Sequence, residues 1–153
     1  CVMAKSKMFH FPSWSLVEGD IKVDVKLDRF EKQFQEAQYY LDGQVMNDMV
    51  PYMPQRSNAL INLTRLNSAA LQGTGKVYAA YAIYGRFQYM GKVMVDPDTK
   101  SPWSKPGAKK IVTERPLTYG NPKATPKWFD TAKEKHGKSW VKGVKRIAGG
   151  GKT

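Results

Sequence analysis

The sequence predicts an α+β domain in which a small, mostly antiparallel sheet is flanked by a long helix in the N-terminal half and by a C-terminal helix. Three observations predict this class: an alternating apolar segment, two apolar stripes with helical spacing, and short segments bounded by glycine and proline. No internal repeat or linker divides the chain. We therefore expect one domain at residues 21–148, preceded by an arm at 1–20 and followed by a flexible tail at 149–153.

The first expected strand covers residues 21–27, where apolar residues alternate with charged ones. A period of two is typical of a strand with one buried face. Asp28 and Glu31 then suit the first turn of a helix as an N-cap and its reciprocal partner. A helix should therefore begin at about Arg29.

The helix that follows is indicated by apolar residues at spacings of three and four. They are Phe30, Phe34, Ala37, Leu41, Val45 and Met49. Pro51 and Pro54 should end this helix. Gly43 costs about 1 kcal/mol relative to Ala inside a helix, so the pattern is also compatible with a bend or break there.

The middle of the chain is expected to form a turn and then a hairpin. Residues 51–58 are rich in proline, serine and asparagine, which favour irregular backbone. Residues 59–71 fit either a helix or a strand, because their apolar residues are spaced in both ways, and we favour the strand. Residues 76–82 follow a Gly-Thr-Gly turn and should form a second strand that pairs back.

The next segments are expected to be largely irregular. Residues 81–91 carry four aromatic side chains and suit either a short helix or an extended segment with some rings exposed. Residues 95–107 contain three prolines and no periodicity, which indicates a long loop of the kind that is usually functional or ordered by a partner. A short strand is expected at 110–113, and a turn-rich stretch at 116–122.

A second helix is predicted at the C-terminus, with Thr125 as the N-cap and Pro126 as the first helical residue. Its apolar stripe comprises Trp128, Phe129, Ala132, His136, Trp140, Val144 and Ile147. Gly137 and Gly143 weaken its interior. Three consecutive glycines at 149–151 should end it.

Composition limits the classes of protein to which the chain can belong. Its 153 residues include 25 basic and 13 acidic ones, for a net charge of +12, and 41% are hydrophobic. That hydrophobic content is enough to bury a core, so the chain should fold. The positive charge favours a polyanionic partner, which could be nucleic acid, an acidic protein surface or an anionic membrane.

The cysteine content and the lengths of the apolar runs indicate the cellular compartment of the protein. The single cysteine, Cys1, cannot form an intramolecular disulfide or supply a zinc site that needs two thiolates. No run approaches the roughly 18 apolar residues needed to span a bilayer, and the first residues lack the apolar region of a signal peptide. We therefore expect a chain that stays in the cytoplasm after synthesis and has no membrane partner.

Catalytic patterns are sparse in the sequence. His10 and His136 lie far apart without a metal-ligand partner at fixed spacing, so structural or surface roles are expected. Residues 73–76 read Gly-Thr-Gly-Lys, but they lack the spacing and the following Ser or Thr of a phosphate-binding loop. Asp96 and Asp98 flank a proline, a pattern more typical of a turn than of a hydrolase or a metal site. We expect no enzymatic activity, no cofactor, no metal and no small-molecule substrate.

The basic excess is concentrated near the C-terminus. From Lys123 onward there are nine basic residues and two acidic ones, and four lysines recur at helical spacing between residues 135 and 145. This stripe is either a solvated helix face or a contact surface for phosphate groups or an acidic protein. On the second interpretation, Lys142, Lys145 and Arg146 contact DNA or an acidic partner.

The aromatic block at residues 78–89 has three interpretations: core packing, a protein interface, or base stacking on single-stranded nucleic acid. We expect core packing to account for about half of it and favour an interface for the rest, because aromatic residues, Met and Arg are enriched where subunits meet. The residues assigned to this interface are Tyr84, Phe87, Tyr89 and Met90.

Several short stretches occur in a characteristic order across residues 45–147. They are Val50-Pro51-Tyr52-Met53-Pro54 followed by Ala59-Leu60, Tyr81-Ala82-Ile83-Tyr84, Tyr89-Met90-Gly91-Lys92-Val93-Met94-Val95, and Trp128-Phe129-Asp130-Thr131-Ala132-Lys133 with Trp140. In this order the chain resembles the minor capsid proteins of long-tailed bacteriophages, a head-tail connector family of neck and tail-completion proteins. The family's usual Thr-Gly appears here as Ser57-Asn58, and Asn can adopt the left-handed conformation that Gly supplies. Residues 1–27 match no part of that family.

The resemblance implies a structural protein of the virion that acts without catalysis in the neck, at the head-tail junction. It implies a tail-completion, tail-terminator or connector ring, sixfold or twelvefold, through which the DNA passes. The implied partners are other copies of the chain, neighbouring neck, portal-side and tail proteins, and non-specifically the genomic DNA. It implies synthesis in the host bacterial cytoplasm before assembly into the virion.

A head-to-tail ring needs two different surfaces on each subunit. Tyr84, Phe87, Tyr89 and Met90, in subunit or tail contacts, and the proline loop are the candidates for those surfaces. The alternative function is a basic nucleic-acid-binding module, and a more distant one is a hydrolase using Asp96 and Asp98.

Overall fold

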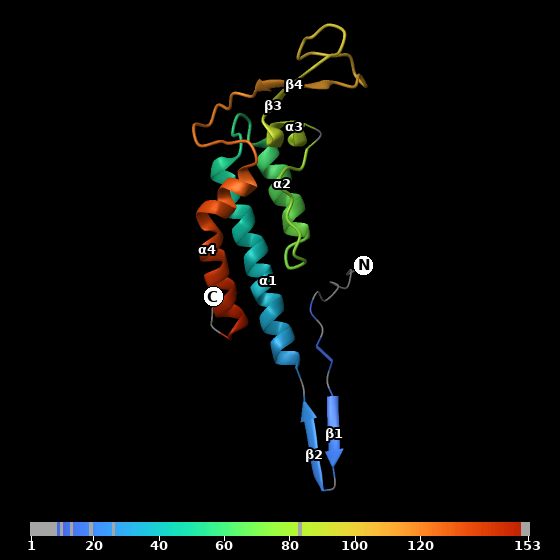
Figure 1. Cartoon of the computed structure of the whole chain (residues 1–153), viewed down its shortest axis with the longest axis vertical. Coiled ribbons are helices and arrows are strands. Elements are labelled where there is room, and N and C mark those ends of the chain that lie inside the picture. The colour runs from blue at the N-terminus through green and yellow to red at the C-terminus, as the bar shows by residue number, and fades with distance from the viewer. Residues whose placement is uncertain are drawn as a thin grey trace.

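Within the part of the chain that the structure describes, three helices form the body of the molecule and a hairpin extends from each end (Figure 1). The structure is a computed structural model and describes residues 9, 11–12, 14–18, 20–25, 27–82 and 84–150. The helices of the body are α1 (Asp28–Met49), α2 (Ala59–Ala70) and α4 (Trp128–Ala148). The other elements are β1 (Trp14–Glu18), β2 (Ile21–Val25), the 3-10 helix η1 (Val50–Tyr52), α3 (Gly85–Met90), β3 (Lys92–Val95) and β4 (Ile111–Pro116).

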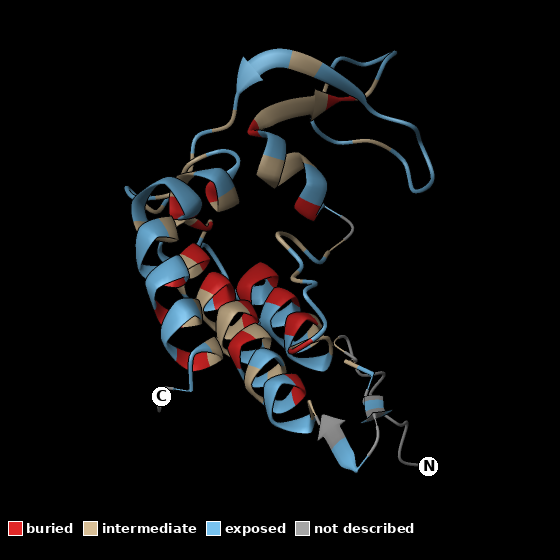
Figure 2. Ribbon diagram, turned by 60° about the horizontal axis from the view of Figure 1, so that its bottom comes forward, coloured by how far each residue is buried: buried red, intermediate tan, exposed pale blue. Residues whose placement is uncertain are grey.

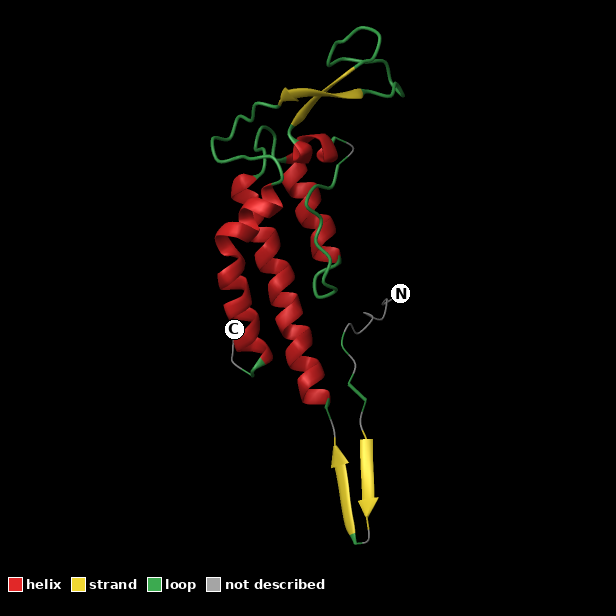
Figure 3. Ribbon diagram, in the orientation of Figure 1, coloured by secondary structure: helices red, strands yellow, loops and turns green. Residues whose placement is uncertain are grey.

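The predicted fold class is confirmed: the chain is α+β, with antiparallel strands and long helices in its N-terminal half and at its C-terminus (Figure 3). The described strands form two separate antiparallel pairs, β1 with β2 and β3 with β4. The small sheet that the sequence predicted is thus divided between the two ends of the helical body.

The first hairpin joins the expected arm to the first expected strand. β2 confirms the strand predicted from residues 21–27, and its partner β1 lies within the arm at 1–20. Trp14 is opposite Val25, and Glu18 is opposite Ile21. The described contacts of this hairpin are almost entirely between its own two strands, and it extends beyond the first turn of α1 (Figure 1).

The long helix α1 is confirmed, but its expected cap is wrong. Leu27, not Asp28, occupies the N-cap position, and its carbonyl oxygen accepts the Phe30 N–H at 2.9 Å. Asp28 lies inside the first turn, where the helix dipole still favours a carboxylate. The helix continues through Gly43 without a break and ends before Pro51, where η1 follows.

Helix α2 corrects the prediction of a strand at residues 59–71. Its buried residues, Leu60, Ile61, Thr64 and Ser68, are spaced as one helix face requires. The expectation for Asn58 is confirmed, because its φ of 56° places it in the left-handed region just before the helix. The segment carries both periodicities, and burial against the body selects the helical one.

The strand predicted at residues 76–82 is also wrong. This segment runs irregularly along α2, and its backbone donors bond side chains of that helix. The Tyr78 N–H donates to Ser68 Oγ at 3.1 Å, and the Tyr81 N–H donates to Thr64 Oγ1 at 2.9 Å. Two buried hydroxyl groups thus satisfy the backbone that a partner strand would otherwise have paired.

Helices α1 and α4 run antiparallel and make the most extensive contact in the body (Figure 1). Gly143 of α4 permits their close approach, because the Tyr40 ring of α1 occupies the space that a Cβ would take. Near the same contact, Trp140 Nε1 donates to Asp48 Oδ2 at 2.6 Å. α4 begins at Trp128, two residues later than predicted, after Lys127 in the left-handed region.

The core lies where α1, α2 and α4 meet the turn that follows α1 (Figure 2). Its buried residues are Val45, Met46, Met49, Met53, Leu60, Ile61, Trp128, Ala132 and Trp140. Trp128 is completely buried, and its Nε1 donates to the Ala79 carbonyl at 2.8 Å. This bond fixes the irregular segment after α2 against α4.

The second hairpin carries the long loop predicted from the proline-rich segment. The strand expected at residues 110–113 is confirmed as part of β4, and it pairs with β3, with Val95 opposite Ile111. The connection spans residues 96–110, hereafter the tryptophan loop. It lies at the opposite end of the molecule from the β1–β2 hairpin (Figure 1).

Candidate functional site

The four aromatic and methionine residues assigned to an interface lie on or beside α3, but they do not share one exposed face. Tyr84 is 45% exposed and Met90 is 49% exposed, whereas Phe87 and Tyr89 are half-buried. Tyr89 packs edge-on against the buried Trp128, with ring centroids 4.9 Å apart. Tyr84 and Met90 are therefore available to a partner, whereas Tyr89 belongs partly to the core.

The pKa of Tyr89 agrees with its partly buried position. Burial raises the pKa of its phenol, and the nearby Asp130 carboxylate raises that pKa further. Its carbonyl oxygen accepts the Lys127 N–H at 2.7 Å, which ties α3 to the start of α4. Tyr89 thus stays protonated at neutral pH and positions the elements around it.

The three basic residues assigned to DNA or an acidic partner lie together at the end of α4. Lys142, Lys145 and Arg146 are all exposed. The core-facing side of the same helix carries Trp128, Ala132, Trp140 and Ile147. The predicted cationic stripe is therefore an outward-facing surface, and its last-turn charges also suit the negative end of the helix dipole.

Of the two histidines, only His136 lies among the described residues and can be compared with its expected structural role. His136 is half-buried, and its Nε2 lies 3.2 Å from the Tyr52 hydroxyl in a hydrogen bond between α4 and η1. This geometry gives His136 a structural contact. His10 lies outside the described residues, as do Cys1 and residues 151–153.

The glycine-rich segment at 73–76 is occupied by a carboxylate of the protein itself. The N–H groups of Gly73 and Gly75 donate to Oδ2 of the buried Asp42 at 2.8 and 3.0 Å. The other oxygen of Asp42 accepts a bond from Gln38 Nε2 at 2.7 Å. The backbone amides that could bind a phosphate group are thus already engaged, and the segment closes onto α1.

Asp96 and Asp98 are arranged as turn residues. Asp96 Oδ1 accepts the Asp98 N–H at 2.9 Å and the Thr99 N–H at 3.1 Å. The Thr99 amide, and then that of Asp98, lower the pKa of the Asp96 carboxyl below its ordinary value. No group of three or more potential metal ligands occurs among the residues that the structure describes.

Sequence reasoning missed Trp103 as a candidate for contact with a partner. Its side chain is 86% exposed, more than that of any other large hydrophobic residue described as exposed. The only sequence signal is its place between prolines and lysines in a segment without periodicity. Such a position gives a tryptophan no neighbouring apolar residue with which to form a core.

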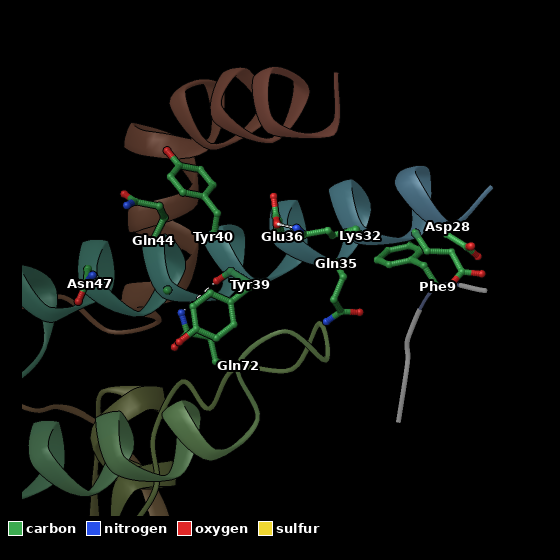
Figure 4. A pocket seen from close by; sticks show the side chains of 12 residues that line it. Phe9, Asp28, Lys32, Gln35, Glu36, Tyr39, Tyr40, Gln44, Asn47 and Gln72 are labelled. Carbon is green, nitrogen blue, oxygen red and sulfur yellow. Dashed lines mark hydrogen bonds and ion pairs between the residues drawn. The ribbon is translucent and has the colours of Figure 1, made fainter. Parts of the chain in front are cut away.

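A groove along most of α1, from Asp28 to Asn47, was also missed, because it depends on residues far apart in sequence (Figure 4). Its volume is about 920 Å³. We call it the acidic groove, and we define it by three aromatic and three acidic lining residues. These are Phe9, Tyr39, Tyr40, Asp28, Glu31 and Glu36.

None of the described helices is long and apolar enough to cross a membrane. Comparison with known proteins found no matching family model, curated protein or solved structure.

Proposed function

We propose that the chain is a structural component of a tailed-bacteriophage virion, part of the neck at the head-tail junction. In this role it is a subunit of a connector or tail-completion ring through which DNA passes, and it performs no catalysis. The observation that carries the proposal is the pair of projecting hairpins at opposite ends of the helical body (Figure 1). The sequence resemblance to phage minor capsid proteins supports the same role.

The hairpins have the properties of assembly elements. A two-stranded hairpin is at best marginally stable in water unless it packs on something else. Val17 and Ile21 are exposed on the first hairpin, and Ile111 and Val112 are exposed on the second. Contact with neighbouring subunits would cover these apolar side chains and complete both small sheets.

The elongated shape suits a protein that sits between two other layers of a virion. One hairpin can contact a head-side neighbour and the other a tail-side neighbour, while the helical body contacts adjacent copies. Tyr84 and Met90 are exposed beside the second hairpin, so they can take part in a subunit or tail contact. Phe87, which is half-buried, adds area at the edge of that surface.

An amber mutation in the gene for this chain tests the proposal. We expect infected cells to accumulate filled heads and complete tails that are not joined, as seen by electron microscopy of the lysate. Supplying the wild-type chain in trans should restore joined particles. Normal infectious virions from the amber mutant would overturn the proposal.

A second candidate function is a nucleic-acid-binding module, which the exposed basic residues of α4 favour. Each phosphate contact by such a residue contributes about −0.9 to the slope of log affinity against log salt concentration on duplex DNA. For a binding module, replacing Lys142 and Lys145 with Gln should reduce that slope by about 2. A subunit of the neck should show only weak DNA binding in this titration, with little change on substitution.

A further inference from the structure

The tryptophan loop presents one large apolar side chain on a fixed backbone. The Trp103 N–H donates to Ser101 Oγ at 3.1 Å, and Lys110 Nζ donates to the neighbouring Pro102 carbonyl at 2.6 Å. At the base of the loop, the Asp96 N–H donates to the Ser101 carbonyl at 2.8 Å. The loop is therefore ordered by its own bonds while the indole is 86% exposed. Binding through such a loop would require little further ordering.

The charge around Trp103 is positive. Lys100, Lys105, Lys109 and Lys110 are all exposed on the same loop. Its acidic residues are Asp96 and Asp98, and the Asp96 carboxylate accepts backbone hydrogen bonds. The loop thus combines an apolar anchor with a cationic rim, the arrangement that a pocket with aromatic walls and acidic edges would bind.

The acidic groove has that complementary character. Tyr39, Tyr40 and Phe9 supply aromatic surface, while Asp28 and Glu36 supply exposed carboxylates. Glu31 is buried, and its Oε1 accepts the Phe11 N–H at 2.7 Å. Lys32 is the basic residue among those that line the groove. Its 3.9 Å ion pair with Glu36 joins two well-exposed side chains, so it contributes little and can be exchanged. The groove's volume falls within the range of pockets that bury ligands of drug size, which is enough for an indole and adjoining backbone.

The loop and the groove cannot meet within one molecule. The loop lies beyond β3 at one end of the body, whereas the groove begins at the first turn of α1 toward the other end (Figure 1). A contact between them must therefore join two copies of the chain. Because the two surfaces differ, the contact is head-to-tail and can be repeated around a closed ring.

We propose that the tryptophan loop of one copy docks into the acidic groove of the next copy, with Trp103 inserted against Tyr39, which is exposed and points toward Gln72 (Figure 4). The loop lysines then face the exposed Asp28 and Glu36 of the neighbouring copy. This proposal rests on the proposed role in the virion and specifies the contact between adjacent subunits.

Thiol cross-linking of the 153-residue chain tests the contact. The native thiol is removed by Cys1→Ser, and one preparation then carries Ser104→Cys beside Trp103 while the other carries Gln44→Cys in the groove. The two preparations are mixed at high concentration with a short bifunctional thiol reagent. We expect several-fold more cross-linked dimer from the mixture than from either preparation alone, because a head-to-tail contact joins loop to groove.

Matched variants separate this contact from random collision. Asn62→Cys places a thiol on the exposed side of α2 and should give only background cross-linking with Ser104→Cys. Trp103→Ala should abolish the specific product, and Trp103→Phe should retain part of it. Glu36→Lys in the groove preparation should reduce the product, whereas Glu134→Lys on α4 should not.

The same pairs of variants are then examined in particles assembled in cells. Cross-linking of residue 104 to residue 44 in particles supports the docking. Particles that contain the chain but give only background cross-linking, as with position 62, overturn the docking while the virion role stands. Absence of the chain from particles overturns the virion role itself. If duplex DNA protects the thiol at position 104 from the reagent and no specific dimer forms, the loop contacts DNA and the docking is wrong.

Discussion

At the scale of single residues, the contact between α1 and α4 depends on glycine at position 143, which has no side chain. Gly143 is buried, and a Cβ built there would lie 2.7 Å from Cζ of Tyr40. At Gly137, six residues earlier on α4, the nearest atom to such a Cβ is Lys133 Cγ at 3.8 Å. The two glycines weaken the helix equally in principle, but only one of them is required by packing.

This difference predicts opposite results from the same substitution. Gly137→Ala should stabilise the fold by about 0.5–1 kcal/mol, because Ala favours the helical backbone. Gly143→Ala should gain the same amount but lose about 1–3 kcal/mol to crowding against Tyr40, for a net loss of stability. Urea denaturation of both variants measures the free energies of unfolding. Equal stabilisation by both would contradict the close approach of the two helices.

The described tryptophan side chains show how residue chemistry follows position. Trp128 and Trp140 are buried, and each indole N–H donates to an acceptor inside the fold. Trp103 has its backbone N–H bonded but its side chain exposed. Burying an indole requires a partner for its N–H, and the same need selects a polar edge in whatever surface covers Trp103.

At the scale of elements, the tryptophan loop owes its shape to the Asp96 carboxylate. The amides of Thr99 and Asp98 stabilise the ionised carboxylate and lower its pKa. The contribution of this turn is therefore complete above the ordinary Asp pKa and is lost as the pH falls through the lowered value.

An NMR titration checks this behaviour. The amide signals of Asp98 and Thr99 should shift together with a midpoint below the ordinary Asp value of 3.8. Asp96→Asn keeps an acceptor oxygen and should retain the turn without the titration, whereas Asp96→Ala should lose both and expose these amides to faster exchange. A midpoint above 3.8 would show that the bonds to the carboxylate are not formed.

Elements with a single strong periodicity could be predicted from the sequence. β2, α1 and α4 follow from alternation or helical stripes, and the tryptophan loop follows from its prolines. α2 could not be assigned, because its apolar residues fit both periods and only packing against α1 and α4 distinguishes them. The irregular course of residues 76–82 depends on hydroxyl groups of α2, so it is a tertiary property.

Some residues of the candidate surfaces could also be predicted from the sequence, and others could not. The outward position of Lys142, Lys145 and Arg146 follows from helical spacing, and the structure places them as expected. The inward position of Tyr89 and the exposure of Trp103 depend on contacts that no local pattern encodes. The acidic groove combines Phe9, α1 and Gln72, and it could be found only from the assembled fold.

At the scale of the whole molecule, the account predicts that the surface near α3 can be altered without loss of the fold. Replacing Tyr84 and Phe87 with Ser should leave the fold intact at a cost of about 1 kcal/mol, because Tyr84 is exposed and only Phe87 is half-buried. The same double variant should prevent heads from joining to tails, as counted in electron micrographs.

Tyr89→Ser is the matched control for that variant. It removes a ring that packs on Trp128 and should lower the free energy of unfolding by about 1–3 kcal/mol. If the Tyr84 and Phe87 double variant unfolds instead, those rings belong to the core and the assigned interface is wrong.

The charge and shape of the whole chain fit a part that is complete only in an assembly. The net charge of +12 repels free copies from one another, and on the proposed role acidic protein surfaces or DNA would neutralise it. On the proposed role, the two hairpins and the exposed indole would find their packing partners in neighbouring chains. On the proposed role, we expect copies that are monomeric at low concentration and that associate at high concentration or on a neighbouring ring.

Gold-labelled antibody against this chain tests the central claim most directly, when it is applied to phage particles purified from cells that express the chain's gene and is viewed by electron microscopy. The account predicts label concentrated at the junction between head and tail, in amounts that fit a ring of copies. Purified virions that contain none of the chain, or that carry it elsewhere, would contradict it.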